Sequence, residues 1–148
     1  MRLSTKGRYG TRLMLELALN YSNRPVLLSE VAKRQEISVK YLEQLVRPLK
    51  IAGLIQSVRG ARGGYMLTRP PSKITLKEII TVLEGQLSLV ECVFSGNCSR
   101  WVWCVTKDIW KEISKKVIDF LSEITLQDMV HRYRKKEHRN QKILMYNI

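Results

Sequence analysis

Apolar residues recur at helical spacing through the first fifty residues of the chain. From Ser4 to Tyr21 an apolar side chain returns every three or four positions on one face, which predicts an amphipathic helix. Ser29 stands where it could cap a second, short helix, and Ser38 where it could cap a third helix that ends at Gly53. The apolar stripe of this third helix consists of Leu42, Leu45, Val46 and Leu49.

The pattern then changes from helical to extended. Two short β-prone runs, LIQSV and YMLT, flank the glycine-rich turn RGARGG, which predicts a β-hairpin with Arg59 and Arg62 at its tip. Thr75 and Glu78 form a capping box that starts a further helix. Helix, short helix, capped helix and basic hairpin, in this order, are typical of a winged helix-turn-helix. We expect residues 1–83 to form this DNA-binding domain.

A long amphipathic helix is predicted from Cys104 onward, and we expect residues 104–131 to form the dimerisation helices. The apolar residues of the long helix are Ile109, Ile113, Val117, Phe120 and Ile124. Such a stripe needs a partner, so we expect the helix to pair with its copy in a second subunit; packing on its own domain is the alternative. The basic tail at 132–148 fits either a partly disordered segment or one that lies along DNA. The expected fold class is mostly α with a small β-hairpin: a winged helix-turn-helix domain plus a long C-terminal dimerisation helix.

Charge is segregated along the chain, whose formal net charge is +13. Residues 1–73 carry fourteen Lys or Arg against four acids, residues 74–131 six against eight, and residues 132–148 six against one. A protein that grips a phosphate backbone concentrates positive charge in this way. We therefore expect double-stranded DNA as a partner, with an ordinary solvated basic surface as the alternative.

Several classes of protein are disfavoured by what the sequence lacks. No apolar run reaches the ~20 residues of a membrane span, and the first residues lack the apolar centre of a signal peptide. We expect a cytoplasmic protein with no membrane partner. No Ser/His/Asp arrangement or phosphate-binding loop is present either, so we expect neither an enzyme nor a small-molecule substrate.

The third helix presents candidate DNA-reading side chains near its N-terminal end, where recognition helices read bases. Gln44 can offer a donor and an acceptor to adenine, and Glu43 can accept from a cytosine amino group. An ordinary i,i+4 ion pair between Glu43 and Arg47 is the alternative. Arg59 at the wing suits a minor groove or a phosphate. The predicted DNA contacts are Ser38, Lys40, Tyr41, Glu43, Gln44, Arg59, Gly60 and Arg62.

All three cysteines of the chain, Cys92, Cys98 and Cys104, lie within the stretch CVFSGNCSRWVWC. Their C-x5-C-x5-C spacing does not match the paired C-x2-C arms of a zinc ribbon, and an odd number does not suit structural disulfides. Soft thiolates on a flexible loop suit an iron–sulfur cluster that takes its fourth ligand from another group. Three incidental cysteines are the alternative. We therefore expect residues 84–104 to be a cluster-binding loop.

Four motifs in this order resemble the IscR-like family of bacterial winged-helix transcription regulators, over nearly the whole chain. They are RLSTKGRYG at the start, ISVKYLEQLV on the third helix, SVRGARGGYML at the wing and the cysteine triad ahead of the long helix. The resemblance implies a homodimer with crossed long helices, operator contacts by Glu43, Gln44 and Arg59, and a cluster held by the three cysteines. It also implies that cluster status selects the operators bound and that genes of cluster assembly are regulated.

One part of the family pattern is missing. The histidine that completes a 2Fe–2S site three residues after the last cysteine is replaced by Lys107, and the acid that related 4Fe–4S sensors of nitric oxide recruit is replaced by Arg8. Glu91, Asp108, His131, solvent or a small thiol are the candidates for the fourth ligand. We expect a 2Fe–2S rather than a 4Fe–4S cluster. A nitric-oxide or redox sensor, and a cluster-independent regulator controlled by a partner protein, are the alternative functions.

Overall fold

The computed structural model describes the chain over residues 3–96 and 98–146. Within that part it has seven α-helices, one short 3-10 helix and one antiparallel pair of strands. Their bounds are α1 (Thr5–Leu19), α2 (Leu28–Gln35), α3 (Val39–Ile51), β1 (Ile55–Val58), β2 (Gly64–Leu67), η1 (Pro71–Lys73), α4 (Leu76–Glu84), α5 (Glu91–Ser95), α6 (Val105–Glu123) and α7 (Leu126–Tyr146). The predicted fold class is confirmed: the first half is a winged helix-turn-helix, and helices make up the second half.

The core of the DNA-binding half lies between α1, α3 and α4, which pack on one another. Leu13 from α1, Leu42 and Leu49 from α3, and Ile79 from α4 are completely buried. Ser38 caps α3 as predicted, because its hydroxyl accepts the backbone N–H of Tyr41 at 3.2 Å. Fixing both the inner face and the start of α3 determines which side chains this helix presents to solvent.

The β-hairpin that forms the wing is connected to the helical part of the domain by a short antiparallel bridge. Its two strands pair in the register Ile55 with Leu67 through Val58 with Gly64. Tyr65 and Val26 then exchange two backbone hydrogen bonds of 2.9 Å, which tie the hairpin to the segment before α2. A side chain at Gly64 would collide with the Val26 carbonyl, so glycine permits this close approach.

The predicted cap of the second helix is wrong. Helix α2 begins at Leu28, its N-cap residue is Leu27, and no side chain caps it, so Ser29 lies inside the first turn. Leu28 and Val31 are both buried in the core. Burial of Leu28 on the inner face fixes where the helix starts, and this outweighs the cap that Ser29 would have provided.

The long helix predicted from Cys104 onward ends at Glu123, and a second helix begins at Leu126, a break that the apolar pattern did not predict. Thr125 and Asp128 form a capping box: the Thr125 N–H donates to the Asp128 carboxylate at 2.9 Å, and the Asp128 N–H donates to the Thr125 hydroxyl at 3.2 Å. This box restarts the helix as α7 and turns the chain in a new direction.

The segment between α6 and α7 pairs with a similar sequence motif earlier in the chain. ITLQD at 124–128 repeats ITLKE at 74–78, where Thr75 and Glu78 form the predicted capping box of α4. The two motifs meet as an antiparallel bridge, with Leu76 N–H donating to the Ile124 carbonyl at 2.8 Å and Leu126 N–H donating to the Ile74 carbonyl at 2.9 Å. The starts of α4 and α7 are therefore locked together.

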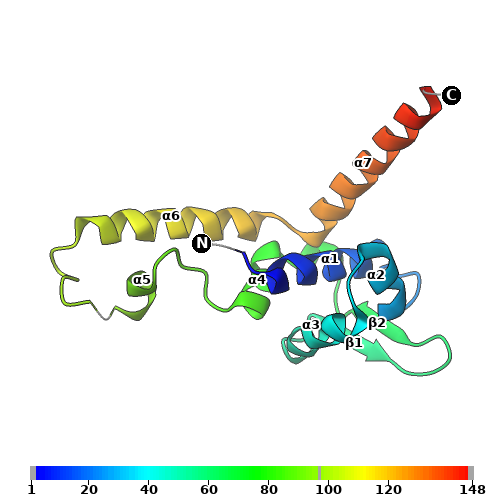
Figure 1. Ribbon diagram of the computed structural model, residues 1–148, viewed down its shortest axis with the longest axis horizontal. Helices are drawn as coiled ribbons and strands as arrows, with labels where there is room; N and C mark the ends of the chain where they lie inside the picture. Colours follow the sequence, from blue (N-terminus) through cyan, green and yellow to red (C-terminus); the bar gives the residue numbers. More distant parts are fainter. Residues whose placement is uncertain (1–2, 97, 147–148) are drawn as a thin grey trace.

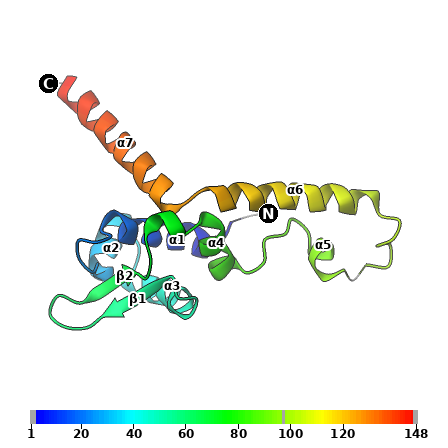
Figure 2. The same ribbon diagram turned by 180° about the vertical axis from the view of Figure 1, so that it is seen from behind.

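Helices α6 and α7 leave the body in different directions (Figure 1). Helix α6 extends to one side, with α5 beneath it and the cysteine loop at its far end, while α7 rises from the face of α1 away from α3 and the wing (Figure 2). The basic tail, predicted to be partly disordered or to lie along DNA, is helical to Tyr146; positions 147–148 lie outside the described residues, as do 1–2 of the first domain. None of the described helices is both long and apolar enough to cross a membrane.

Candidate nucleic-acid interface and cysteine loop

Helix α3 turns a polar face to solvent, as the pattern predicted. Lys40, Glu43, Gln44 and Arg47 are exposed, while the apolar stripe of the same helix is buried. The ion pair between Glu43 and Arg47 that offered an alternative role for Glu43 is not formed among the described residues. The carboxylate of Glu43 and the amide of Gln44 are therefore available to a ligand.

Cations of the first half divide into two groups. Arg24, Arg34 and Arg69 are paired with acids on their own domain, at 2.7 Å for Arg24 with Glu30 and 3.1 Å for Arg34 with the buried Glu16. The cations on α3 and at the wing make no ion pair with any described residue; they are Lys40, Arg47, Lys50, Arg59 and Arg62. The side of the domain that α3 and the wing share therefore carries five cations without an ion pair among the described residues, while Lys33 and Lys73 are unpaired elsewhere on the domain.

The tip of the wing presents Arg59, Gly60 and Arg62 to solvent. The turn is tight: the Gly63 N–H donates to the Gly60 carbonyl at 2.9 Å, and Gly60 adopts a φ of 108°, which glycine tolerates far better than other residues. This turn holds the two arginines at the outermost point of the hairpin. Gly60 therefore serves the backbone geometry rather than offering a side chain.

Tyr41 has a packing role as well as a position beside the predicted contacts. Its half-buried ring meets Tyr9 of α1 edge to face, with ring centroids 5.9 Å apart. The guanidinium groups of Arg8 and Arg12 lie 5.7 and 5.4 Å from the centre of the Tyr9 ring. This places two exposed cations of α1 near the start of α3.

These α1 cations were missed by reasoning from the sequence. A groove between α1, α3 and α4 is lined by Lys6 and Gln44 together, so Lys6 belongs to the same surface. The signal was available, because Lys6, Arg8 and Arg12 are three cations on one short helix. Charge spacing alone does not tell which of them face α3, since that depends on the packing of Tyr9.

The three cysteines lie in the long connection between α4 and α6, residues 85–104, which we call the cysteine loop. Cys92 is in α5, Cys98 is exposed in the loop that follows, and Cys104 is the N-cap residue of α6. The Asn97 position inside the loop lies outside the described residues. In the described part of the chain no three His, Cys, Asp or Glu side chains are gathered closely enough to hold a metal ion. The three thiols are soft ligands by their chemistry. To bind one cluster together, they would have to move closer to one another.

The environment of Cys104 favours its thiolate form. A hydrogen bond with the Thr106 hydroxyl, at 3.2 Å, and one from the Lys107 backbone lower the pKa of the Cys104 thiol. Thiolate, not thiol, binds metals, so these contacts prepare Cys104 as a ligand.

Lys107, which stands where the family has a histidine ligand, contacts Trp101. Its ammonium donates to the Trp101 carbonyl at 2.7 Å and lies 4.5 Å from the centre of the Trp101 ring. This cation-π contact holds the last turn of the cysteine loop against the start of α6. Of the candidates for a fourth ligand, Glu91 and Asp108 lie on α5 and the first turn of α6, whereas His131 is on α7, beyond the other end of α6.

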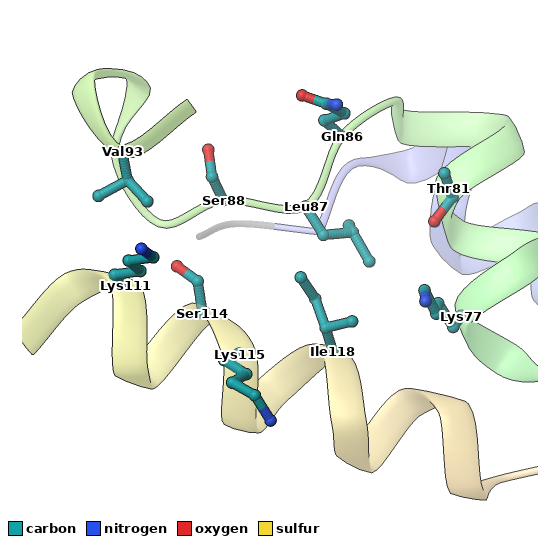
Figure 3. A pocket seen from close by; sticks show the side chains of 10 residues that line it. All are labelled: Lys77, Thr81, Gln86, Leu87, Ser88, Val93, Lys111, Ser114, Lys115 and Ile118. Carbon is teal, nitrogen blue, oxygen red and sulfur yellow. The ribbon is translucent and has the colours of Figure 1, made fainter. Parts of the chain in front are cut away.

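An apolar cavity of about 450 Å³ separates α6 from the segment that follows α4. Leu87 and Ile118 face each other across it (Figure 3). Beside them Ser114 is buried and its hydroxyl accepts the Leu89 N–H at 3.2 Å, which fastens the segment to α6. The other lining residues are Lys77, Thr81, Gln86, Ser88, Val93, Lys111 and Lys115.

Three of the five residues of the predicted apolar stripe are exposed on a neighbouring face of α6, while Val117 is half-buried and Ile124 is buried at the end of the helix. Ile109, Ile113 and Phe120 are 48%, 39% and 59% exposed. The face turned to the protein's own domain carries Ser114 and Ile118 instead. Val105 and Trp110 of the same helix are also exposed, so α6 leaves five large apolar side chains uncovered.

Comparisons with known proteins agree with this architecture. A family model described as "Rrf2: Iron-dependent Transcriptional regulator" matches residues 3–132. The HTH-type transcriptional regulator IscR of Klebsiella pneumoniae is 40% identical over 131 residues, which make up 88% of this chain and 80% of that protein.

Two solved structures of similar proteins share the fold. CymR, the global cysteine regulator of B. subtilis, is 40% identical and superposes with a TM-score of 0.78 over 89% of this chain and 98% of its own. IscR of T. potens is 41% identical, with a TM-score of 0.75 over 90% and 88% of the two chains. The expected resemblance to IscR-like regulators is confirmed, and the relatives are regulators rather than enzymes. The chain belongs to the Rrf2 family of DNA-binding transcriptional regulators.

Proposed function

We propose that the protein is a homodimeric transcription regulator whose operator binding is modulated by an iron–sulfur cluster on the cysteine loop. The observation that carries the DNA-binding half of this proposal is the surface of unpaired cations shared by α3 and the wing. Arg24, Arg34 and Arg69, by contrast, are paired with acids of their own domain. Phosphates are the natural counter-charges for the cations that are not.

The roles of individual residues follow from their positions. Gln44 and Glu43 project from the exposed face of α3 and read base edges in the major groove, while Lys40 holds a phosphate beside them. Ser38 acts mainly as the cap of α3, and Tyr41 mainly supports the helix from α1. Arg59 and Arg62 follow the backbone or the minor groove from the wing, on the turn that Gly60 allows.

A binding experiment distinguishes side chains that recognise bases from side chains that bind phosphates. Gln44→Ala should reduce the preference for a selected operator duplex over a scrambled duplex, because the base contact is lost. Arg62→Ala should weaken binding to both duplexes alike and make the dependence on salt less steep. Fluorescence anisotropy over a range of salt concentrations measures both effects. Equal losses on the two duplexes for Gln44→Ala would remove it as a base reader.

Cys92, Cys98 and Cys104 would hold the cluster, with 2Fe–2S favoured. The support is the chemistry of the donors: three soft sulfur ligands lie in one loop region, and the pKa of the Cys104 thiol is lowered by its hydrogen bonds with Thr106 and the Lys107 backbone. A bound cluster would supply a redox-sensitive centre. The chain's own contribution is the closing of the loop, which Lys107 anchors at one end through Trp101.

The exposed stripe on α6 supports pairing with the same helix of a second subunit. Large apolar side chains at helical spacing on one face are what a helix pair buries. Closing of the cysteine loop would be transmitted along α6, which contacts α4 and is fastened to the preceding segment at Ser114. We propose genes of cluster assembly as the targets.

The cluster is tested by the anaerobic absorption spectrum together with iron and sulfide counts per dimer. Wild-type protein should show charge-transfer absorption, and Cys92→Ala should lose it. Wild-type protein without such absorption after anaerobic purification would rule the cluster out. A second candidate, a regulator that senses through other means, is favoured by the similarity to CymR and by thiols that are not gathered. Iron counts near zero with intact operator binding would select this candidate.

A further inference from the structure

Helix α7 leaves the body of the protein after its first turns. Leu126 and Val130 are buried against the core, whereas residues 131–141 are exposed without exception. Both views show this part of α7 projecting into solvent (Figures 1 and 2). This part of α7 packs on no other described element and carries one large apolar side chain, Tyr133, so its own chain stabilises it little and a ligand could stabilise it further.

Four of the exposed residues form a basic stripe: Arg132, Lys135, Lys136 and Arg139. Their spacing of i, i+3, i+4 and i+7 puts them on one face, on the side away from Leu126 and Val130. None of the four makes an ion pair with a described residue. Like charges three and four residues apart repel one another, so the stripe destabilises the isolated helix and calls for a ligand with several negative charges.

The stripe lies on a different side of the protein from the proposed operator surface. Helix α3 and the wing are at one side of the body, and α7 extends from the other (Figure 1). A duplex gripped by α3 and the wing would therefore not run beneath the stripe. The protein has two separate basic surfaces.

We propose that the basic stripe binds the phosphate backbone of a second DNA duplex, so that the protein bridges an operator to another DNA segment. This inference rests on the proposed DNA binding by α3 and the wing and adds a second surface to it. DNA fits the chemistry because the stripe consists only of cations, which pair with backbone phosphates whatever the base sequence. A membrane surface fits less well along the stripe itself, since Tyr133 is the one large apolar side chain among residues 131–141 and the apolar run at 143–146 comes only after them.

A capture experiment on the full-length protein tests the bridge. An operator duplex selected from a random pool is immobilised on beads, protein is added, and the retention of a free fluorescent duplex of scrambled sequence is measured. The stripe variant carries Arg132→Gln, Lys135→Gln, Lys136→Gln and Arg139→Gln. The control loses the same number of charges elsewhere, through Lys33→Gln, Lys73→Gln, Lys111→Gln and Lys115→Gln, all at exposed positions.

Wild-type protein and control should retain the scrambled duplex, and the stripe variant should retain about tenfold less while it binds the immobilised operator as before. Circular dichroism checks that the variant keeps its helices. Retention equal to wild type in the stripe variant overturns the proposal, as does capture that the charge control reduces to the same extent. Operator binding is read separately by anisotropy, so a failure of operator binding itself is recognised as a failure of the proposed function. Binding of wild-type protein to anionic vesicles without duplex capture would overturn DNA as the ligand.

Discussion

The two halves of the molecule are built from similar apolar patterns but differ in how much of the pattern one chain covers. In the DNA-binding half, Leu42 and Leu49 of α3 are completely buried. On α6, Ile113 and Phe120 follow the same helical spacing and are 39% and 59% exposed. The first half buries its apolar stripe within the chain, whereas α6 leaves part of its stripe exposed.

This difference in burial separates the surface proposed to bind DNA from the region proposed to sense a signal. The surface that would read DNA is held in place by a complete core, a capped helix and a tight wing turn, so it needs no partner to form. The cysteine loop and α6 present ungathered thiols and uncovered apolar side chains. A region completed only by a second subunit or a cluster can respond to either one, which is what a sensor requires.

The largest expected effect is on dimerisation, which is tested by placing a glutamate on the apolar face or on the polar face of α6. Ile113→Glu should raise the dimer Kd by about hundredfold or more, because an unpaired charge buried in an apolar interface costs about 3–5 kcal/mol. Lys115→Glu, which puts the same charge on the polar face, should leave the Kd nearly unchanged. Analytical ultracentrifugation measures both. A dimer that tolerates Ile113→Glu as well as Lys115→Glu would place the interface elsewhere.

A core truncation tests the completeness of the first half. Leu42→Ala should lower the free energy of unfolding by about 2–5 kcal/mol, because it leaves a cavity in a closed core. Leu27→Ala provides a matched control at a site 46% exposed, with an expected loss below about 1 kcal/mol. Urea unfolding gives both values. Similar losses in the two variants would contradict a closed core around α3.

The junction between the halves should respond to loss of either cap. Thr125→Ala and Thr75→Ala should each cost about 0.5–2 kcal/mol in urea unfolding, because each removes the hydroxyl that caps a helix. The two threonines are bridged, so their effects should not add in the double variant. Additive effects would show that the starts of α4 and α7 are energetically independent.

The smallest expected effect is on pH dependence. Hydrogen bonds from the Thr125 hydroxyl and N–H lower the pKa of Asp128. Because its folded pKa lies below the unfolded value of about 3.9, the carboxylate stabilises the fold above about pH 4, and this is lost as pH falls through the folded pKa. Asp128→Asn should flatten the acid limb of the urea midpoint, whereas Glu112→Gln on the exposed face of α6 should not. An unchanged acid limb in Asp128→Asn would contradict this assignment.

The sequence predicted the elements whose signals are local. The cap at Ser38, the stripe of α3, the wing hairpin and the Thr75 box all depend on neighbouring residues, and all are present. The start of α2 was misplaced because burial of Leu28 is a tertiary effect that a cap signal does not contain. The cations of α1 near the start of α3 were missed for the same reason, since packing of Tyr9 on Tyr41 decides where they lie.

The break between α6 and α7 could have been predicted and was not. The repeat of ITLKE as ITLQD marks a second capping box, but apolar periodicity continues across it through Ile124 and suggests one helix. The pairing of the two motifs is long-range and appears only in the structure. Positions of the cysteines along the chain were plain from the sequence, whereas their separation in space was not, because spacing does not fix the path of a loop.

The central claim is that the state of the cysteine loop changes what the DNA-binding half binds. Its most direct test is the affinity for a selected operator duplex, measured by anisotropy under anaerobic conditions on one preparation before and after removal of the cluster, with Cys92→Ala as the cluster-free reference. Removal of the cluster should change the affinity by about tenfold or more, and the stripped protein should match Cys92→Ala. Equal affinity in all three samples, on every operator selected, would contradict it.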